Sequence, residues 1–304
     1  MIDVSFLEIV KIPKVHSVQS PSSISLMMNY LSKALIVALT AASASAFAPT
    51  SISSIQSSAL NVFDEGKGTL GDASTAESGS TIHEDAFSFG AGTVIQGKTL
   101  RTWDIENPAT ERVQVSCKSG ARPFHANVEY WHTPTYIPLK FKCYSEDGQL
   151  RPLNAVIETP KSPKTIACYN INSQEFPLQA TVAQNGLTSA YEVFSKNGPG
   201  DHIQGGKVAS YTLDASVNSV HVLIKTEERN MKATIELTQG PNNIKQSYEI
   251  YASVGYKTPF YAVIETPGPG NVVRIINENP LEFPFNAWVE PFKQGGSVGK
   301  MGWN

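Results

Sequence analysis

Cysteine and net charge are both scarce in this chain. It has three cysteines, Cys117, Cys143 and Cys168, and an odd number does not suit the paired framework of a small secreted protein. Its 24 Lys and Arg side chains stand against 27 Asp and Glu, which leaves a formal net charge of -3. This balance gives no electrostatic reason to bind nucleic acid or an anionic membrane.

Long apolar runs and motifs for catalysis are lacking as well. The apolar run at 34–42 is too short to span a membrane. The chain has no GxSxG nucleophile motif and no metal-ligand spacing of cysteine and histidine. We therefore predict no catalytic residue, no metal and no cofactor. A β-fold enzyme whose site leaves no motif stays open as an alternative.

The N-terminal region has the pattern of a targeting leader. In NYLSKALIVALTAASASAFAPT, one lysine precedes the apolar run, and small residues at Ala44 and Ala46 predict signal-peptide cleavage before Phe47. Met27 or Met28 makes a conventional start for such a signal. We interpret residues 1–27 as a gene-model extension or leader and residues 28–46 as the signal peptide.

Two further segments precede the first domain. Residues 47–63 are rich in serine, and the ASAFAP junction before them resembles the bipartite plastid signal of diatoms and related algae. Plain secretion is the alternative address. Residues 64–86 are polar, small and free of aromatic side chains, which predicts a disordered linker over 64–87.

The hexapeptide AVIETP occurs at 155–160 and again at 262–267, which is 107 positions later. It belongs to a longer internal repeat, because residues 126–182 align with 233–289 without a gap. The match also extends upstream, where an IQG tripeptide recurs after a one-residue slip. The repeat predicts two similar domains and a glycine-rich tail, at 88–194, 195–292 and 293–304.

Apolar residues alternate with a period of two inside both repeats, which is typical of strands with one buried face. VQVSC at 113–117 and VHVLI at 220–224 show this pattern, and breakers such as EDG and ETPGPG separate such runs. Neither repeat contains a convincing amphipathic helix. The predicted fold is all-β, with two tandem homologous antiparallel β-domains related by a pseudo-twofold axis.

The repeated polar and aromatic positions are interpreted as structural. Glu158 and Glu265 each precede a Thr-Pro turn, where a carboxylate accepts turn hydrogen bonds or meets a basic residue. Acid and base catalysis would instead need a pair of carboxylates that converge in one cleft. The signature positions of the two repeats are Glu158, Pro160, Phe176, Glu265, Pro267 and Phe283.

The cysteines also have a structural interpretation. Moving Cys117, Cys143 and Cys168 by 107 positions gives Ile224, Ile250 and Ile275. A residue that isoleucine replaces at the equivalent position is most simply a buried apolar side chain, and a free thiol packs as a small hydrophobe. Reduced core thiols fit a stroma-like compartment better than an oxidising one.

One apparent nucleotide motif is rejected on context. GTVIQGKT at 92–99 matches the phosphate-binding pattern GxxxxGK[ST], which cradles phosphates where a strand leads into a helix. Here the motif precedes the extended stretch LRTWDIENP, and it degrades to GDHIQGGKV in the second repeat.

With its plastid-type leader, its twin AVIETP and EFP domains and its KMGWN ending at 300–304, the chain resembles the diatom pyrenoid shell proteins over about residues 90–304. The resemblance implies a non-enzymatic protein of the plastid stroma that self-assembles into a sheet at the pyrenoid periphery. It implies support of CO2 concentration and carbon fixation. The implied partners are other copies of the chain, paralogous shell proteins and the Rubisco matrix.

The tail is the candidate assembly segment. Nothing in the repeat alignment requires it, and we expect it to dock on an adjacent copy with Trp303 as the buried anchor. Simple disorder of the tail is the alternative. The residues of this hypothetical interface are Gly295, Gly296, Met301, Gly302, Trp303 and Asn304. The alternative function is a lectin-like carbohydrate-binding module that uses Tyr130, Trp131 and Tyr136.

Overall fold

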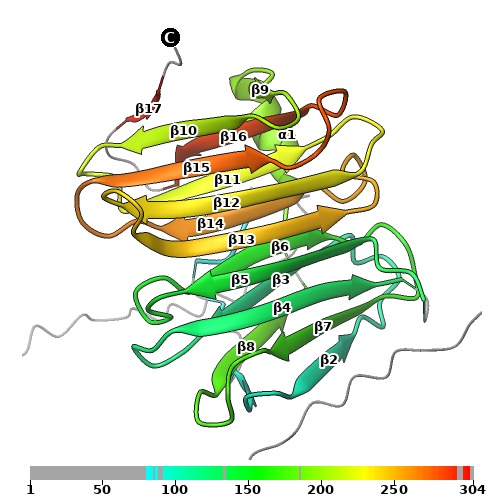
Figure 1. Cartoon of the computed structure of the whole chain (residues 1–304). Coiled ribbons are helices and arrows are strands. Elements are labelled where there is room, and N and C mark those ends of the chain that lie inside the picture. The colour runs from blue at the N-terminus through cyan, green and yellow to red at the C-terminus, as the bar shows by residue number, and fades with distance from the viewer. Residues whose placement is uncertain are drawn as a thin grey trace, which may run out of the picture. The chain divides into compact units, whose positions relative to one another are not determined.

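The computed structural model describes residues 80–84, 86–87, 92–132, 135–184, 186–292 and 297–301, all within one compact unit that spans 71–304. These residues form an all-β fold, as the sequence predicted, and their strands lie in two antiparallel sheets that both repeats share (Figure 1). The expectations for 1–79, including the signal peptide and the transit-peptide-like segment, lie outside the described residues.

One sheet has eight strands. From edge to edge they are β1 (Thr93–Ile95), β8 (Leu178–Ala183), β3 (Arg112–Lys118), β6 (Leu153–Glu158), β14 (Phe260–Glu265), β11 (Ser219–Lys225), β16 (Phe285–Pro291) and β9 (Asp201–Ile203). The first four strands come from the first repeat and the last four from the second.

The other sheet has nine strands. Their order is β17 (Val298–Lys300), β10 (Val208–Leu213), β15 (Asn271–Asn277), β12 (Met231–Gln239), β13 (Ile244–Ala252), β5 (Leu139–Ser145), β4 (Phe124–Trp131), β7 (Thr165–Asn170) and β2 (Leu100–Asp104). Counted outward from its centre, the order of equivalent strands is the same in both repeats, and β17 is the one addition.

The two repeats join in the middle of both sheets. β6 pairs with β14, and within this pair Ala155 lies opposite Ala262. β5 pairs with β13 (Figure 1), and in the register of this pair Lys142 lies opposite Glu249. Both pairs are 107 residues apart, so each repeat meets its equivalent position at the junction. The repeats therefore share both sheets.

A continuous apolar core lies between the sheets. Inward side chains of both repeats belong to it, among them Val115, Phe141, Phe260 and Ile275. The rings of Phe141 on β5 and Phe260 on β14 lie 5.2 Å apart at a steep angle, so they connect the sheets where the repeats meet. The period-two alternation correctly predicted this inward face.

The outer face of the eight-stranded sheet is also covered. A short helix, α1 (Ala190–Phe194), precedes a 3₁₀ turn, η1 (Ser195–Asn197), and Phe194 packs on this face against Leu223 and Trp288. Residues 80–84, which the sequence analysis assigned to a disordered linker, pack there too, and Ile82 is buried.

This cover explains why β3 is buried on both of its sides. Val113, Val115 and Cys117 face the core, as the alternation predicts. Gln114 faces outward and is nevertheless buried, because its amide exchanges hydrogen bonds of 2.7 and 2.9 Å with the backbone of His83. Burial of a polar side chain is tolerated here because its hydrogen bonds are made.

Candidate functional site

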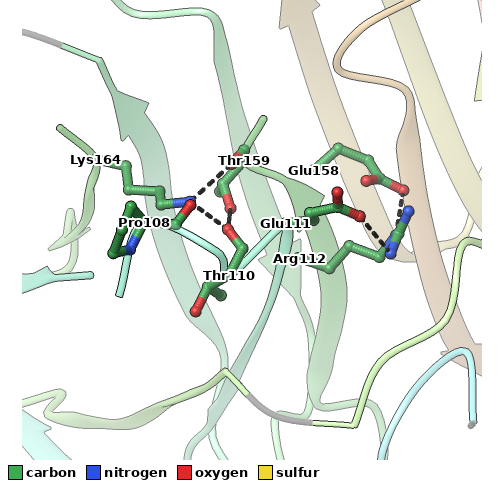
Figure 2. Close-up of polar contacts among 7 residues, drawn as sticks. All are labelled: Pro108, Thr110, Glu111, Arg112, Glu158, Thr159 and Lys164. Carbon is green, nitrogen blue, oxygen red and sulfur yellow. Dashed lines mark hydrogen bonds and ion pairs between the residues drawn. The ribbon is translucent and has the colours of Figure 1, made fainter. Parts of the chain in front are cut away.

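A cluster of polar contacts surrounds the Glu-Thr-Pro corner at the end of β6 (Figure 2). The Arg112 Nε atom lies 3.0 Å from Glu158 Oε1, and both side chains are about one-fifth exposed. Burial raises the pKa of Glu158, while Arg112 favours its ionised form. This contact confirms the sequence interpretation that Glu158 meets a neighbouring basic residue.

Thr159 and Lys164 hold the same corner against the loop before β3. Thr159 donates through its hydroxyl to the Thr110 carbonyl at 3.2 Å. The Lys164 ammonium donates to the carbonyls of Thr159 at 3.0 Å, Pro108 at 3.2 Å and Thr110 (Figure 2). Burial lowers the pKa of Lys164. These groups hold backbone together, and none of them forms a pair that could move a proton to a substrate.

The second repeat builds the corresponding corner with several different side chains. Thr266 donates to the Val217 carbonyl at 2.9 Å, as Thr159 does to Thr110. Asn271 stands where the first repeat has Lys164, and its Nδ2 atom donates to the Thr266 carbonyl at 2.9 Å. The repeated Thr-Pro motif therefore has a backbone-fixing role in both halves.

The IQG and EFP motifs meet each other within each repeat. In the first, Asn170 Nδ2 donates to the carbonyls of Ile95 and Phe176 at 3.0 and 2.8 Å. In the second, Asn277 Nδ2 bonds to the equivalent carbonyls of Ile203 and Phe283, both at 3.0 Å. The asparagine thus connects the two motifs, and its recurrence was visible in the repeat alignment.

Close backbone approach explains the glycine of IQG. A Cβ atom on Gly97 would lie 1.9 Å from the Ser173 carbonyl oxygen, and one on Gly205 would lie 1.8 Å from that of Pro280. The loop around Gly97 joins β1 to β2. Because no helix follows it, the structure supports rejection of the phosphate-binding interpretation.

The phenylalanine of EFP stacks near an arginine in both repeats. The Arg122 guanidinium carbon is 5.8 Å from the Phe176 ring centroid, and that of Arg229 is 5.5 Å from Phe283. Sequence reasoning did not identify these cation–π contacts, although the arginines are also 107 residues apart.

The three thiols are free and buried, as their isoleucine counterparts predicted. Cys117 on β3 and Cys168 on β7 face each other across the core, with their sulfur atoms 3.8 Å apart. The contact with Cys168 and burial raise the pKa of Cys117, and burial raises that of Cys143 to about 12. Thiols in this state are poor nucleophiles, because the thiolate is the reactive form.

Other chemistry is not assembled among the described residues. Within those ranges, no three His, Cys, Asp or Glu side chains gather to hold a metal ion. The histidines contact backbone, amide or aromatic groups; His125 Nδ1, for example, lies 3.0 Å from Asn172 Oδ1. No helix in the described part of the chain is long and apolar enough to cross a membrane.

A family model for diatom pyrenoid shell proteins matches residues 87–291, which include both repeats and the motifs described above. The chain belongs to the diatom pyrenoid shell protein family. The family description indicates a structural protein of the pyrenoid shell, associated with the plastid pyrenoid. No curated protein matches the chain.

Part of the tail of this pyrenoid shell protein forms a strand. β17 pairs with β10 at the edge of the nine-stranded sheet. Met301 donates its N–H to the Ser210 carbonyl at 2.9 Å, and its side chain is exposed. The other residues of the expected assembly segment, Gly295, Gly296, Gly302, Trp303 and Asn304, lie outside the described residues.

The three aromatic residues of the carbohydrate-binding alternative differ in exposure. Tyr130 is 1% exposed and faces the core. Trp131 is half-buried and donates to Glu129 Oε2 at 2.8 Å, whereas Tyr136 is exposed. The buried ring of Tyr130 cannot stack on a sugar, so the three side chains do not form one binding surface.

A groove of about 700 Å³ was not found by sequence reasoning. It lies beside α1, and Tyr191, Tyr256, Lys225 and Trp288 are among its lining residues. Lys225 Nζ is 3.1 Å from the Tyr191 ring centroid and 4.9 Å from that of Tyr256. Lys118 is the equivalent of Lys225 in the first repeat, and its Nζ atom lies 3.9 Å from the Phe87 ring centroid. This lysine therefore contacts an aromatic ring in both repeats.

Proposed function

We propose that this pyrenoid shell protein is a non-enzymatic building block that self-assembles into a thin sheet around the Rubisco-containing pyrenoid. The observation that carries the proposal is the matching strand order on both sides of the central pairs Ala155–Ala262 and Lys142–Glu249. This arrangement supports a pseudo-twofold axis through the junction of the repeats. One copy then presents related surfaces on two sides, and contacts of the open-ended kind propagate from copy to copy.

Electron microscopy of the purified chain tests assembly directly. The chain should form sheets or tubes without any ligand, because its partner is another copy of itself. A chain that stays monomeric at high concentration would refute the shell proposal and favour the carbohydrate-binding alternative. Glycan binding measured on the same preparation separates the two functions.

The proposed address is the plastid stroma at the pyrenoid periphery, where the sheet supports CO2 concentration and carbon fixation. The ASAFAP junction and the serine-rich stretch after it support this address. A fluorescent fusion should outline the pyrenoid in a diatom, and Phe47→Ala should divert it from the stroma. Secretion of the intact fusion would contradict this address. Paralogous shell proteins and the Rubisco matrix are proposed as further partners, and co-purification from plastids tests them.

For the tail, we keep Trp303 as the proposed anchor on a neighbouring copy. Because β17 belongs to the sheet, a truncation after Phe292 would remove both the anchor and an edge strand. Truncation after Met301 removes only Gly302, Trp303 and Asn304. This variant should keep its circular dichroism spectrum and fail to form extended sheets. Normal sheets from it would remove Trp303 from the mechanism.

A further inference from the structure

β2 and β10 are equivalent strands of the two repeats. β2 is at one edge of the nine-stranded sheet, and β10 is next to the tail strand β17 at the other. Leu100 of β2 pairs with Tyr169, and Val208 of β10 pairs with Ile276. Tyr169 and Ile276 are 107 residues apart, and the one-residue slip places Leu100 and Val208 108 apart. In this register Trp103 corresponds to Tyr211, and Glu106, just beyond β2, corresponds to Asp214.

The β10 edge is covered by the tail strand of the same chain. Thr212 lies opposite Gly299 in this pairing. Asp214 N–H donates to the Ser297 carbonyl at 3.2 Å, while the Asp214 carboxylate accepts from the N–H and hydroxyl of Ser297 at 2.8 and 2.7 Å. Val298 packs against the core from this position. Lys300 Nζ also lies 2.7 Å from Asp201 Oδ1. The strand Ser297–Met301 is therefore held by edge backbone and by the carboxylates of Asp214 and Asp201.

The β2 edge presents the equivalent backbone groups and the Glu106 carboxylate, without a strand on it among the described residues, whereas Thr93 stands in place of Asp201. Ile105 N–H donates to the Lys164 carbonyl on the β7 side, so the N–H groups of Asp104 and Glu106 point the other way, toward the free edge. Thr102, Asp104 and Glu106 are exposed. Among the described residues no strand pairs with this side of β2, and Glu106 has no hydrogen-bond or ion-pair partner.

We propose that the β2 edge is a second acceptor for the strand Ser297–Met301, supplied by a second copy of the chain. This inference rests on the proposed function, because it names the contact by which copies join. Glu106 would accept from Ser297 in place of Asp214, and Thr102, Asp104 and Glu106 would pair along the strand. Addition of a strand to an exposed sheet edge is a general mode of peptide recognition.

Moving the tail strand from β10 of its own chain to β2 of a second copy replaces one set of strand-pairing hydrogen bonds with another. The tail strand leaves one edge and gains an equivalent one, as in domain swapping, where an identical element moves between protomers at low cost. Donor and acceptor surfaces differ, so the contact is head-to-tail and continues from copy to copy. Five residue steps separate Phe292 from Ser297 and span roughly 17 Å at most. The acceptor copy must therefore place its β2 edge within that distance of the donor's Phe292.

Mixtures of two variants of the full chain, each with one added cysteine, test this pairing. One variant carries Glu106→Cys and the other carries Ser297→Cys, and the native thiols are buried and do not compete. Under mild oxidation the assembled mixture should give a disulfide-linked dimer. The control mixture combines Ser297→Cys with Glu228→Cys, which lies on an exposed loop. It should give at least tenfold less disulfide-linked dimer. Equal yields from the two mixtures would overturn the proposal.

A proline variant tests the edge independently. In Thr102→Pro the removed N–H points away from β7, so the ladder with β7 is kept, and proline is tolerated at such edge positions. This variant should keep the β-sheet circular dichroism spectrum and lose sheet formation, whereas the matched variant Thr102→Val should assemble normally. Normal assembly of Thr102→Pro would overturn the proposal, and if the variant fails to fold, the cysteine mixtures decide.

Failure of this inference is distinguishable from failure of the proposed function. If the wild-type chain forms sheets but the Glu106→Cys and Ser297→Cys variants do not cross-link, the β2 contact is excluded and the shell function stands. If the wild-type chain forms no sheets under any of these conditions, the proposed function itself fails, and this contact fails with it.

Discussion

The two repeats keep hydrogen bonds that fix the backbone and differ in a largely buried ion pair. Asn170 and Asn277 make the same pair of carbonyl contacts in their repeats. By contrast, Arg112, which pairs with Glu158, is replaced by Ser219 in the second repeat. The difference teaches that the duplicated sequence retains side chains that connect its backbone segments, while some side-chain pairs have diverged.

The outer faces of the repeats have diverged as well. On the eight-stranded sheet, Gln114 and Ser116 of the first repeat correspond to His221 and Leu223 of the second. Leu223 belongs to the apolar cluster under α1, whereas Gln114 is held by polar contacts with His83. Two copies of one fold therefore present unlike surfaces, although their cores are related.

The largest effect is expected where the repeats are most alike. Gly97→Ala and Gly205→Ala each push a Cβ atom against a carbonyl oxygen, so each should lower the free energy of unfolding by about 3 kcal/mol or more. Urea denaturation followed by circular dichroism measures the loss. Gly120→Ala is the control, because its Cβ would meet nothing within 4 Å. If both Gly97→Ala and Gly205→Ala unfold at the same urea concentration as the wild type, this close approach is not required.

A smaller effect should separate the repeats at the diverged ion pair. Arg112→Ala leaves the Glu158 carboxylate largely buried without its partner and should cost about 2 to 3 kcal/mol. Ser219→Ala should be neutral or slightly stabilising, because the buried Ser219 hydroxyl has no hydrogen-bond partner among the described residues. Equal unfolding free energies for the two variants would mean that the ion pair contributes nothing.

The second repeat should also carry a pH dependence that comes from a buried histidine, His221, at the position where the first repeat has Gln114. Burial lowers the pKa of His221 from 6.5 to about 4. The unfolded chain therefore binds a proton over this range that the folded chain does not, so stability is greatest above pH 6.5 and falls as the pH drops toward 4. Between pH 7.5 and pH 5 the loss should be roughly 2 kcal/mol.

Urea denaturation at these two pH values checks the prediction. His221→Gln, which introduces the residue of the first repeat, should remove most of the difference. His125→Gln, at an exposed ring, should leave it unchanged. A full pH dependence in His221→Gln would assign the effect to another group.

The smallest change is expected from exchanging core residues between the repeats. Cys168→Ile should fold, assemble and lose about 1 kcal/mol, because the pocket must accept a larger apolar side chain. Cys168→Asp, by contrast, should not fold. Thiol alkylation gives a second measurement: the folded wild type should react slowly and the unfolded chain completely. Three thiols that react rapidly and are essential in the folded protein would contradict the buried-core interpretation.

Much of the fold could be predicted from the sequence because its signals are local. The alternation at 113–117 identified the core face of β3, and the recurrence of isoleucine at the cysteine positions identified buried thiols. The packing of residues 80–84, α1 and β17 could not be predicted in the same way. Each of these segments is short, lies outside the aligned repeat and gains its stability from surfaces that only the folded sheets provide.

The candidate site was also predictable only where the signal was local. Glu158 was expected to meet a basic residue because it precedes a turn, but nothing local indicated that Arg112, 46 residues earlier, supplies it. Likewise the recurrence of IQG with a one-residue slip related the segments that precede β2 and β10. It did not reveal that β10 carries the tail strand while, among the described residues, no strand pairs with the outer side of β2.

The sequence by itself determined that this protein is a duplicated β-structure with buried thiols and a shell-family pattern, because side-chain periodicity and repeat spacing are written along the chain. The tertiary structure alone decided that the repeats merge into two shared sheets through β6 with β14 and β5 with β13. It also decided which edges are covered. The physical reason is that strand pairing satisfies backbone hydrogen bonds, and nearly every residue type offers the same N–H and carbonyl groups, so the choice of partner depends on packing between distant segments.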